Sequence, residues 1–125
     1  LAKDFPHAII VLEHAGMRED DSPAGRTAWA EGLKRLAENA NVSTKLSGLG
    51  TFVQRCDAAS IADIMHQTVE IFGAERCMFG SNFPIEKLWT SYADLLNGHR
   101  VAAAHYCEPE RRAIFHDTAA RIYRL

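Results

Sequence analysis

The feature that most constrains this chain is a short strand-like segment that recurs at a fixed interval. Three segments have the composition of strands: residues 8–12, 42–46 and 77–79. Equivalent points at their carboxyl ends lie 34 residues apart. A continuously apolar segment such as 8–12 is typical of a strand that is covered on both faces. The interval leaves room for one helix between successive strands, which predicts a repeated β/α unit.

Helical patterns fill the intervals between these segments. Apolar residues recur at helical spacing in three stretches: 29–40, 61–72 and 89–96. Asp57 is placed to cap the second helix, and Gly73 is placed to end it. Because proline is favoured in a first helical turn, a fourth helix is expected to begin near Glu108-Pro109. The residues expected to pack this last helix are Phe115, Ala119 and Ile122.

This order of elements predicts an α/β fold with a parallel sheet and right-handed crossovers. Two architectures share the order, a doubly wound sheet and a piece of a (β/α)8 barrel. A doubly wound nucleotide binder carries a glycine-rich phosphate loop between a strand and a helix, and this sequence has none. The chain has 125 residues, whereas a complete barrel needs about 250. We therefore expect residues 1–125 to form a single unit that is part of a barrel.

Charge and cysteine content exclude several classes of protein. The 14 basic and 16 acidic residues are mixed along the chain and give a net charge of −2. This distribution provides neither a basic patch for nucleic acid nor a basic amphipathic helix for a membrane surface. The three cysteines form no Cys-x-x-Cys pair, so neither a disulfide framework nor a zinc knuckle is expected. We therefore expect a cytoplasmic protein.

Short polar clusters follow each predicted strand: residues 13–16, 47–48 and 81–84. In parallel α/β barrels the active site lies at the carboxyl ends of the strands, where these clusters would meet. The candidate residues are His14, Lys45, Ser47, Ser81 and Asn82.

Each candidate also has a structural interpretation. A histidine after a buried strand is often a hydrogen-bonded structural residue, and Asn82 followed by Phe83-Pro84 is also typical of a turn. Lys45 could be an exposed strand residue. His7 precedes the first strand, at the opposite end of the sheet. The other four histidines lie in helical segments, where we expect packing or solvent contact.

The sequence resembles the amidohydrolase-related family, in its branch of TIM-barrel metal-dependent hydrolases, which includes sugar-lactone and pyrone-dicarboxylate lactonases. The resemblance rests on four segments in order: residues 5–16, 41–49, 72–84 and 117–123. The most specific part is Phe79-Gly80-Ser81-Asn82-Phe83-Pro84. The resemblance implies the sixth, seventh and eighth strands of a (β/α)8 TIM barrel, that is, its last three β/α units plus a final helix.

The resemblance also implies roles for the candidate residues. His14 matches the sixth-strand histidine, which polarises the scissile carbonyl or the attacking water. Asn82 matches an eighth-strand position where most members carry aspartate as metal ligand or general base. By this reading Lys45, Ser47 and Ser81 would bind an anionic or hydroxylated substrate. The family implies a divalent metal, with zinc the candidate. Asn82 argues against it, because an amide has no basic site and is a weak neutral ligand.

We therefore expect a hydrolase that opens a lactone or another ester or amide bond in a small metabolite. A second hypothesis is non-oxidative decarboxylation, which the wider family also performs. A third is a non-catalytic barrel fragment that acts only by assembly, because three barrel strands leave two unpaired edges. On each hypothesis the 125-residue chain alone is expected to be inactive and to need the missing amino-terminal half of the barrel or self-association.

Overall fold

The computed structural model describes all residues from 1 to 125. Its sheet has three parallel strands in the order β1-β2-β3: β1 (Ile10–Leu12), β2 (Val42–Leu46) and β3 (Cys77–Phe79). The parallel pairing and the consecutive order confirm the predicted topology. The first strand is shorter than expected, because residues 8 and 9 precede the paired segment.

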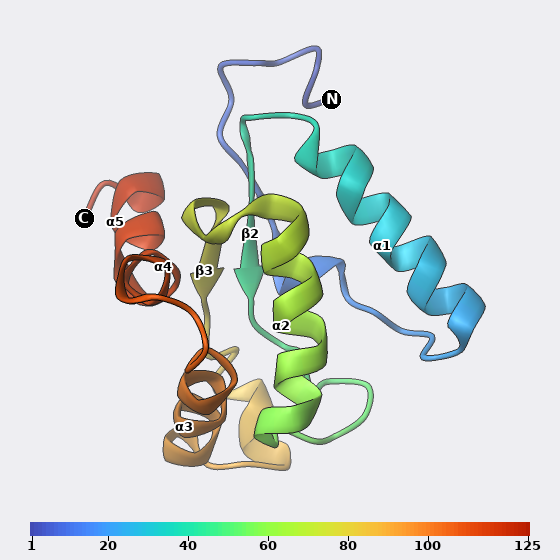
Figure 1. The fold of residues 1–125 in the computed structure, drawn as a ribbon, viewed down its shortest axis with the longest axis vertical. Helices are drawn as coiled ribbons and strands as arrows, with labels where there is room; N and C mark the ends of the chain where they lie inside the picture. Colours follow the sequence, from blue (N-terminus) through green and yellow to red (C-terminus); the bar gives the residue numbers. More distant parts are fainter.

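Two helices lie between the strands in the chain: α1 (Pro23–Ala37) and α2 (Ala58–Phe72). In Figure 1, α2 lies at the front beside β2, and α1 lies to its right. The Asp57 side chain accepts a hydrogen bond from the Ser60 N–H and caps α2, as predicted. Gly73 ends this helix with a φ of 79°, a conformation that favours glycine.

The chain continues beyond β3 as three further α-helices: α3 (Tyr92–Ala102), α4 (Glu108–Arg112) and α5 (Thr118–Tyr123). Short 3-10 turns occupy 13–16, 74–76 and 85–88. Figure 1 shows α4 and α5 to the left of the sheet and α3 below β3, near the carboxyl ends of the strands.

The last helical segment packs in a different register from the one predicted. Phe115 contacts the core, as expected, but Ala119 and Ile122 are only half-buried. The buried residues are Ala113, Ile114 and Thr118. A π-helical stretch at Ala113–Asp117 causes the difference, because its wider turn rotates the following residues relative to an α-helix.

The core lies between the sheet and the helices. Val42 and Leu46 of β2 are fully buried in it, together with Leu33 of α1 and Met65 of α2. Because side chains alternate along a strand, Lys45 lies on the opposite face of the sheet. We call that opposite face the inner face. The expected alternation of β2 is therefore present.

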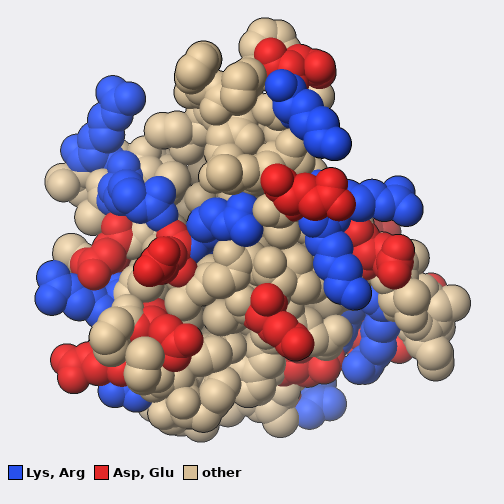
Figure 2. All heavy atoms as spheres, turned by 45° about the horizontal axis from the view of Figure 1, so that its top comes forward, with Lys and Arg blue, Asp and Glu red and all other residues tan.

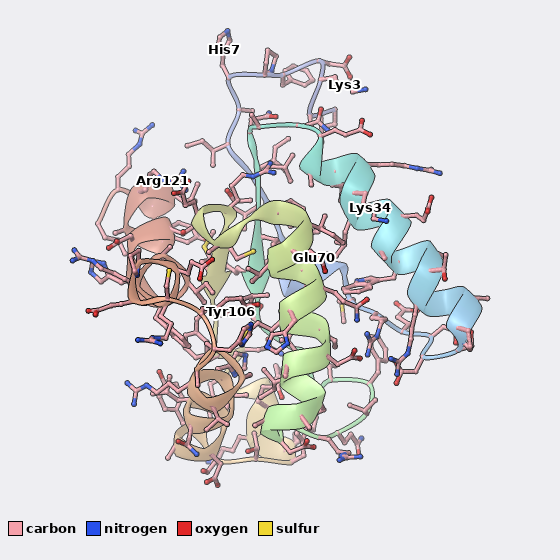
Figure 3. All side chains as sticks on the ribbon, viewed as in Figure 1. Lys3, His7, Lys34, Glu70, Tyr106 and Arg121 are labelled. Carbon is pink, nitrogen blue, oxygen red and sulfur yellow. The ribbon has the colours of Figure 1, made fainter.

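Hydrogen bonds to the main chain hold the amino ends of the strands. The Arg76 guanidinium donates to the carbonyl oxygens of Phe72, Ala37 and Asn39. These contacts join the end of α2 to the segment between α1 and β2. His7 lies at this end of the molecule, away from α3, as Figure 3 shows. The predicted position of His7, opposite the polar clusters, is thus confirmed.

Charged side chains of both signs are interspersed on the face that Figure 2 shows, as the sequence indicated. None of the helices combines the length and the apolar character that crossing a membrane requires.

Candidate functional site

Three polar side chains meet where the strands end. The His14 Nδ1 atom lies 2.7 Å from the Ser47 hydroxyl, which joins the segments after β1 and β2. A Cβ atom placed on Gly48 would lie 2.9 Å from His14 Nδ1 and 3.2 Å from Asn82 Nδ2. The side chains of His14 and Asn82 therefore both lie against Gly48, close to the position that a side chain there would occupy. We call His14, Ser47, Gly48 and Asn82 the rim site.

The backbone of the rim site has positive φ angles at His14 and Asn82. His14 has a φ of 56° and Asn82 has a φ of 53°. Left-handed conformations cost an L-residue roughly 1–2 kcal/mol, and asparagine tolerates them better than most residues. Non-glycine residues are kept in such conformations where the surrounding structure requires them, which is frequent at binding and catalytic sites.

Two atoms of the rim site are free to contact a ligand. Within the chain His14 makes its side-chain hydrogen bond through Nδ1, and Asn82 through Nδ2. His14 Nε2 and Asn82 Oδ1 are not among the buried polar atoms that lack a partner, so solvent reaches both. The Ser47 hydroxyl can donate to Nδ1 or accept from it. His14 Nε2 can accordingly present either a proton or a lone pair.

Lys45 places a positive charge on the inner face, two residues before Ser47 of the rim site. Its Nζ lies 3.0 Å from Glu13 Oε1 and 5.4 Å from the centre of the Tyr123 ring. Contacts with the Tyr123 hydroxyl and the Glu13 carboxylate hold the pKa of Lys45 above its usual range. The Lys45 side chain is therefore protonated near neutral pH, but the structure does not bring it into contact with His14.

Ser81 and Ser47 have different surroundings from each other. The Ser81 hydroxyl accepts a hydrogen bond from the Phe83 N–H at 3.3 Å, which is a contact within its own turn. Ser47 is buried, and its hydroxyl faces His14. Of the predicted residues, the structure thus brings together His14, Ser47 and Asn82, and leaves Lys45 and Ser81 outside that contact.

The sequence did not indicate one residue of this region, Glu86. Its side chain is fully buried. The Asn82 amide donates to Glu86 Oε1 at 3.1 Å, and the Trp89 indole N–H donates to Glu86 Oε2 at 2.6 Å. The Cys56 thiol also donates to Oε2, at 3.2 Å. The spacing of Glu86, four residues after Asn82 and three before Trp89, was the signal available in the sequence.

Cys56 is suited to this donor role. Burial, together with the adjacent Glu86 carboxylate, raises the pKa of the Cys56 thiol to about 12. The thiol therefore keeps its proton near neutral pH and can donate it to Glu86.

The donor set of the chain does not by itself fit a metal centre. No group of three or more His, Cys, Asp or Glu side chains is arranged to hold a metal ion. The rim site offers one imidazole nitrogen and one neutral amide oxygen, and hydrogen-bond donors surround the Glu86 carboxylate. Zinc sites in proteins usually have at least three such ligands.

The larger hollows of the surface lie away from the rim site. Two of them, of about 990 and 950 Å³, are both lined by Glu108 and Arg112 of α4, among others. A smaller one of about 560 Å³ lies between α1 and α2 and is lined by Lys34 and Glu70, among others. Figure 3 labels both residues, on the outer side of these helices.

The comparison with known proteins identifies the family of the chain. The family model described as Amidohydrolase matches residues 1–125. The chain belongs to the amidohydrolase family. The resemblance inferred from the sequence is thereby confirmed.

Two curated relatives and one crystal structure extend the comparison. This amidohydrolase chain is 39% identical over 125 residues to the y4mH protein of Sinorhizobium fredii, covering 100% of the chain and 42% of that protein. It is 33% identical over 129 residues to an L-fucono-1,5-lactonase of Burkholderia multivorans, covering 93% of the chain and 43% of the lactonase. The chain thus spans less than half the length of these relatives.

The crystal structure is that of a Burkholderia multivorans amidohydrolase with bound zinc. It superposes with a TM-score of 0.85 at 30% identity, covering 99% of this amidohydrolase chain and 48% of the other. The superposition confirms the α/β fold with a parallel sheet.

Proposed function

We propose that this amidohydrolase chain forms the last three β/α units and the final helix of a (β/α)8-barrel hydrolase. The proposed reaction opens a lactone, or another ester or amide bond, in a small metabolite. The observation that carries the proposal is the meeting of His14, Ser47 and Asn82 around Gly48 at the carboxyl ends of adjacent parallel strands. The relationship to an L-fucono-1,5-lactonase supports a lactone as substrate.

The chemistry follows from the two free atoms of the rim site. Water adds to the carbonyl carbon of the lactone, and the ring C–O bond then breaks. His14 Nε2 takes a proton from the water and returns it to the leaving oxygen, as a general base and then a general acid. Asn82 Oδ1 accepts a hydrogen bond and orients the reactants. Ser47 fixes the His14 ring, because its hydroxyl lies against Nδ1.

Substrate binding is proposed for Lys45 and Ser81. The positive charge of Lys45 on the inner face can attract an anionic or strongly polar substrate, although the Glu13 carboxylate offsets part of this charge. The Ser81 hydroxyl lies in the loop that carries Asn82. Substitution of either residue is expected to change KM more than kcat, because neither contacts His14.

The open parts of the sheet support a partner that completes it. The outer edges of β1 and β3 are unpaired, and the Ile9 side chain beside β1 is 53% exposed. Unpaired strand edges associate readily with other strands. We propose that the remainder of the barrel pairs with these edges, or a second copy of the chain in its absence. Assembly without catalysis is the second candidate function.

Replacement of His14 tests the proposal in the full-length protein, with L-fucono-1,5-lactone as the probe. His14→Gln is expected to lower kcat/KM by on the order of 10²-fold, because it removes the proton-transfer group. His7→Gln is the matched control, since His7 is exposed at the opposite end of the strands. Near-wild-type hydrolysis by His14→Gln would return His14 to a structural role and favour assembly as the function.

A further inference from the structure

The buried Glu86 carboxylate lies next to the rim site without facing solvent. A buried charge is costly unless hydrogen bonds or an opposite charge compensate it. Here both carboxylate oxygens accept hydrogen bonds: Oε1 from Asn82 and Thr51, and Oε2 from Trp89 and Cys56. These donors come from the loop after β2 and from the segment that follows Asn82. The carboxylate is thereby held in one place.

This contact determines which way the Asn82 amide points. A carboxylate only accepts hydrogen bonds, so the atom of Asn82 that faces Glu86 must be the nitrogen. An amide oxygen in that place would face another oxygen without a proton between them. The Asn82 Oδ1 atom is therefore turned away from Glu86 and is accessible to solvent.

We infer that Glu86 is a positioning residue that makes Asn82 a hydrogen-bond acceptor at the rim site, directed at a hydroxyl group of the reactants. The inference rests on the proposed function and names the chemistry that this position recognises. An acceptor at residue 82 binds a hydroxyl of the substrate or the attacking water, and it disfavours an oxyanion, which needs a donor.

Exchanging the acid and amide groups between residues 82 and 86 separates this role from simple packing. In Glu86→Gln, the Trp89 indole N–H is an obligate donor and retains the glutamine oxygen. The glutamine NH2 group then faces Asn82, whose amide must turn over and present its own NH2 group to the rim. The single substitution therefore converts an acceptor into a donor.

The double variant Asn82→Asp/Glu86→Gln restores the original polarity. The glutamine NH2 group donates to the aspartate, and the second aspartate oxygen faces the rim as an acceptor. Asn82→Asp alone places two carboxylates at the present 3.1 Å contact, where like charges repel. A packing role alone predicts no such rescue, because each substitution is nearly isosteric.

The experiment measures kcat/KM and the urea midpoint of the full-length protein for the wild type, both single variants and the double variant. Each single substitution is expected to lower kcat/KM on L-fucono-1,5-lactone by about tenfold or more. The kcat/KM of the double variant should recover to within about threefold of the wild-type value. Its urea midpoint, which Asn82→Asp alone is expected to lower, should return to the wild-type value. The inference would be overturned if the double variant showed the product of the two single-variant losses in kcat/KM and the sum of their decreases in urea midpoint.

Two further outcomes show whether Asn82 binds the attacking water or a substrate hydroxyl, and test the Glu86–Asn82 orientation separately from the proposed function. A lactone without ring hydroxyls should show the same losses if Asn82 accepts from the attacking water, and none if it accepts from the substrate. The urea midpoint does not depend on turnover. Rescue of the midpoint in a protein that hydrolyses no lactone would therefore support the Glu86–Asn82 orientation while refuting the proposed function.

Discussion

Replacing Gly48 by alanine tests whether the distance between His14 and Asn82 controls catalysis. The new Cβ would lie 2.9 Å from His14 Nδ1 and 3.2 Å from Asn82 Nδ2, closer than side chains ordinarily approach. At least one of the two side chains must therefore move by a few tenths of an ångström. Gly48 also has a φ of 59°, which costs an alanine roughly 1–2 kcal/mol.

The two effects have different magnitudes and different readouts. A displacement of about 1 Å at a reacting group costs about 10²-fold in rate, so the smaller shift here should lower kcat/KM by about 2- to 10-fold. The backbone strain should lower the Tm of the full-length protein by about 2–8 °C.

Gly73→Ala is the matched control. Gly73 has a φ of 79°, and no atom lies within 4 Å of the position that its Cβ would take. This variant therefore has the backbone strain without the contact. Because Gly73 combines this φ with a ψ of 147°, a conformation that is nearly restricted to glycine, we expect a loss of Tm at least as large as that of Gly48→Ala, with unchanged kcat/KM, measured by differential scanning calorimetry and steady-state lactone hydrolysis. Equal kinetics in the Gly48 and Gly73 variants would refute the argument that the rim site depends on this spacing.

Three other predictions follow from features of the chain. Gly32→Ala should raise stability by about 0.5–1 kcal/mol, because Gly32 lies inside α1 with open space around its Cβ; a lower urea midpoint would contradict this. The full-length enzyme should keep its activity after exhaustive chelation, and Asn82→Asp should bind zinc more tightly. Stoichiometric zinc, with activity lost on its removal, would contradict that proposal. The 125-residue chain alone should show concentration-dependent association by sedimentation, whereas a compact monomer with cooperative unfolding would disprove it.

The sequence predicted the parts of the fold that depend on local patterns. The cap at Asp57 and the stop at Gly73 were correctly placed, because each depends on residues within one helical turn. The approach of His14 to the segment after β2 could also be anticipated, since parallel neighbouring strands end at the same edge. The family of the chain could be inferred because the segments that carry the resemblance follow one another over most of the sequence.

Features that depend on residues distant in the sequence could not be predicted from local patterns. A glutamate is usually exposed. The burial of Glu86 depends on Thr51 and Cys56, which come from a loop about thirty positions earlier. The π-helical stretch that changed the packing of Ile114 has no comparable local signal. The spacing role of Gly48 likewise requires the positions of two other strands.

The Arg76 contacts at the amino ends of the strands bear on how such a protein can diversify. The guanidinium binds carbonyl oxygens of the main chain, so its partners persist when the side chains of those residues change. These contacts lie at the opposite end of the strands from His14 and Asn82. Substitutions that alter the chemistry of the rim site therefore leave this anchoring intact. Descendants of a common ancestor can acquire new substrates by exchanging residues at one end while selection for folding acts on the other.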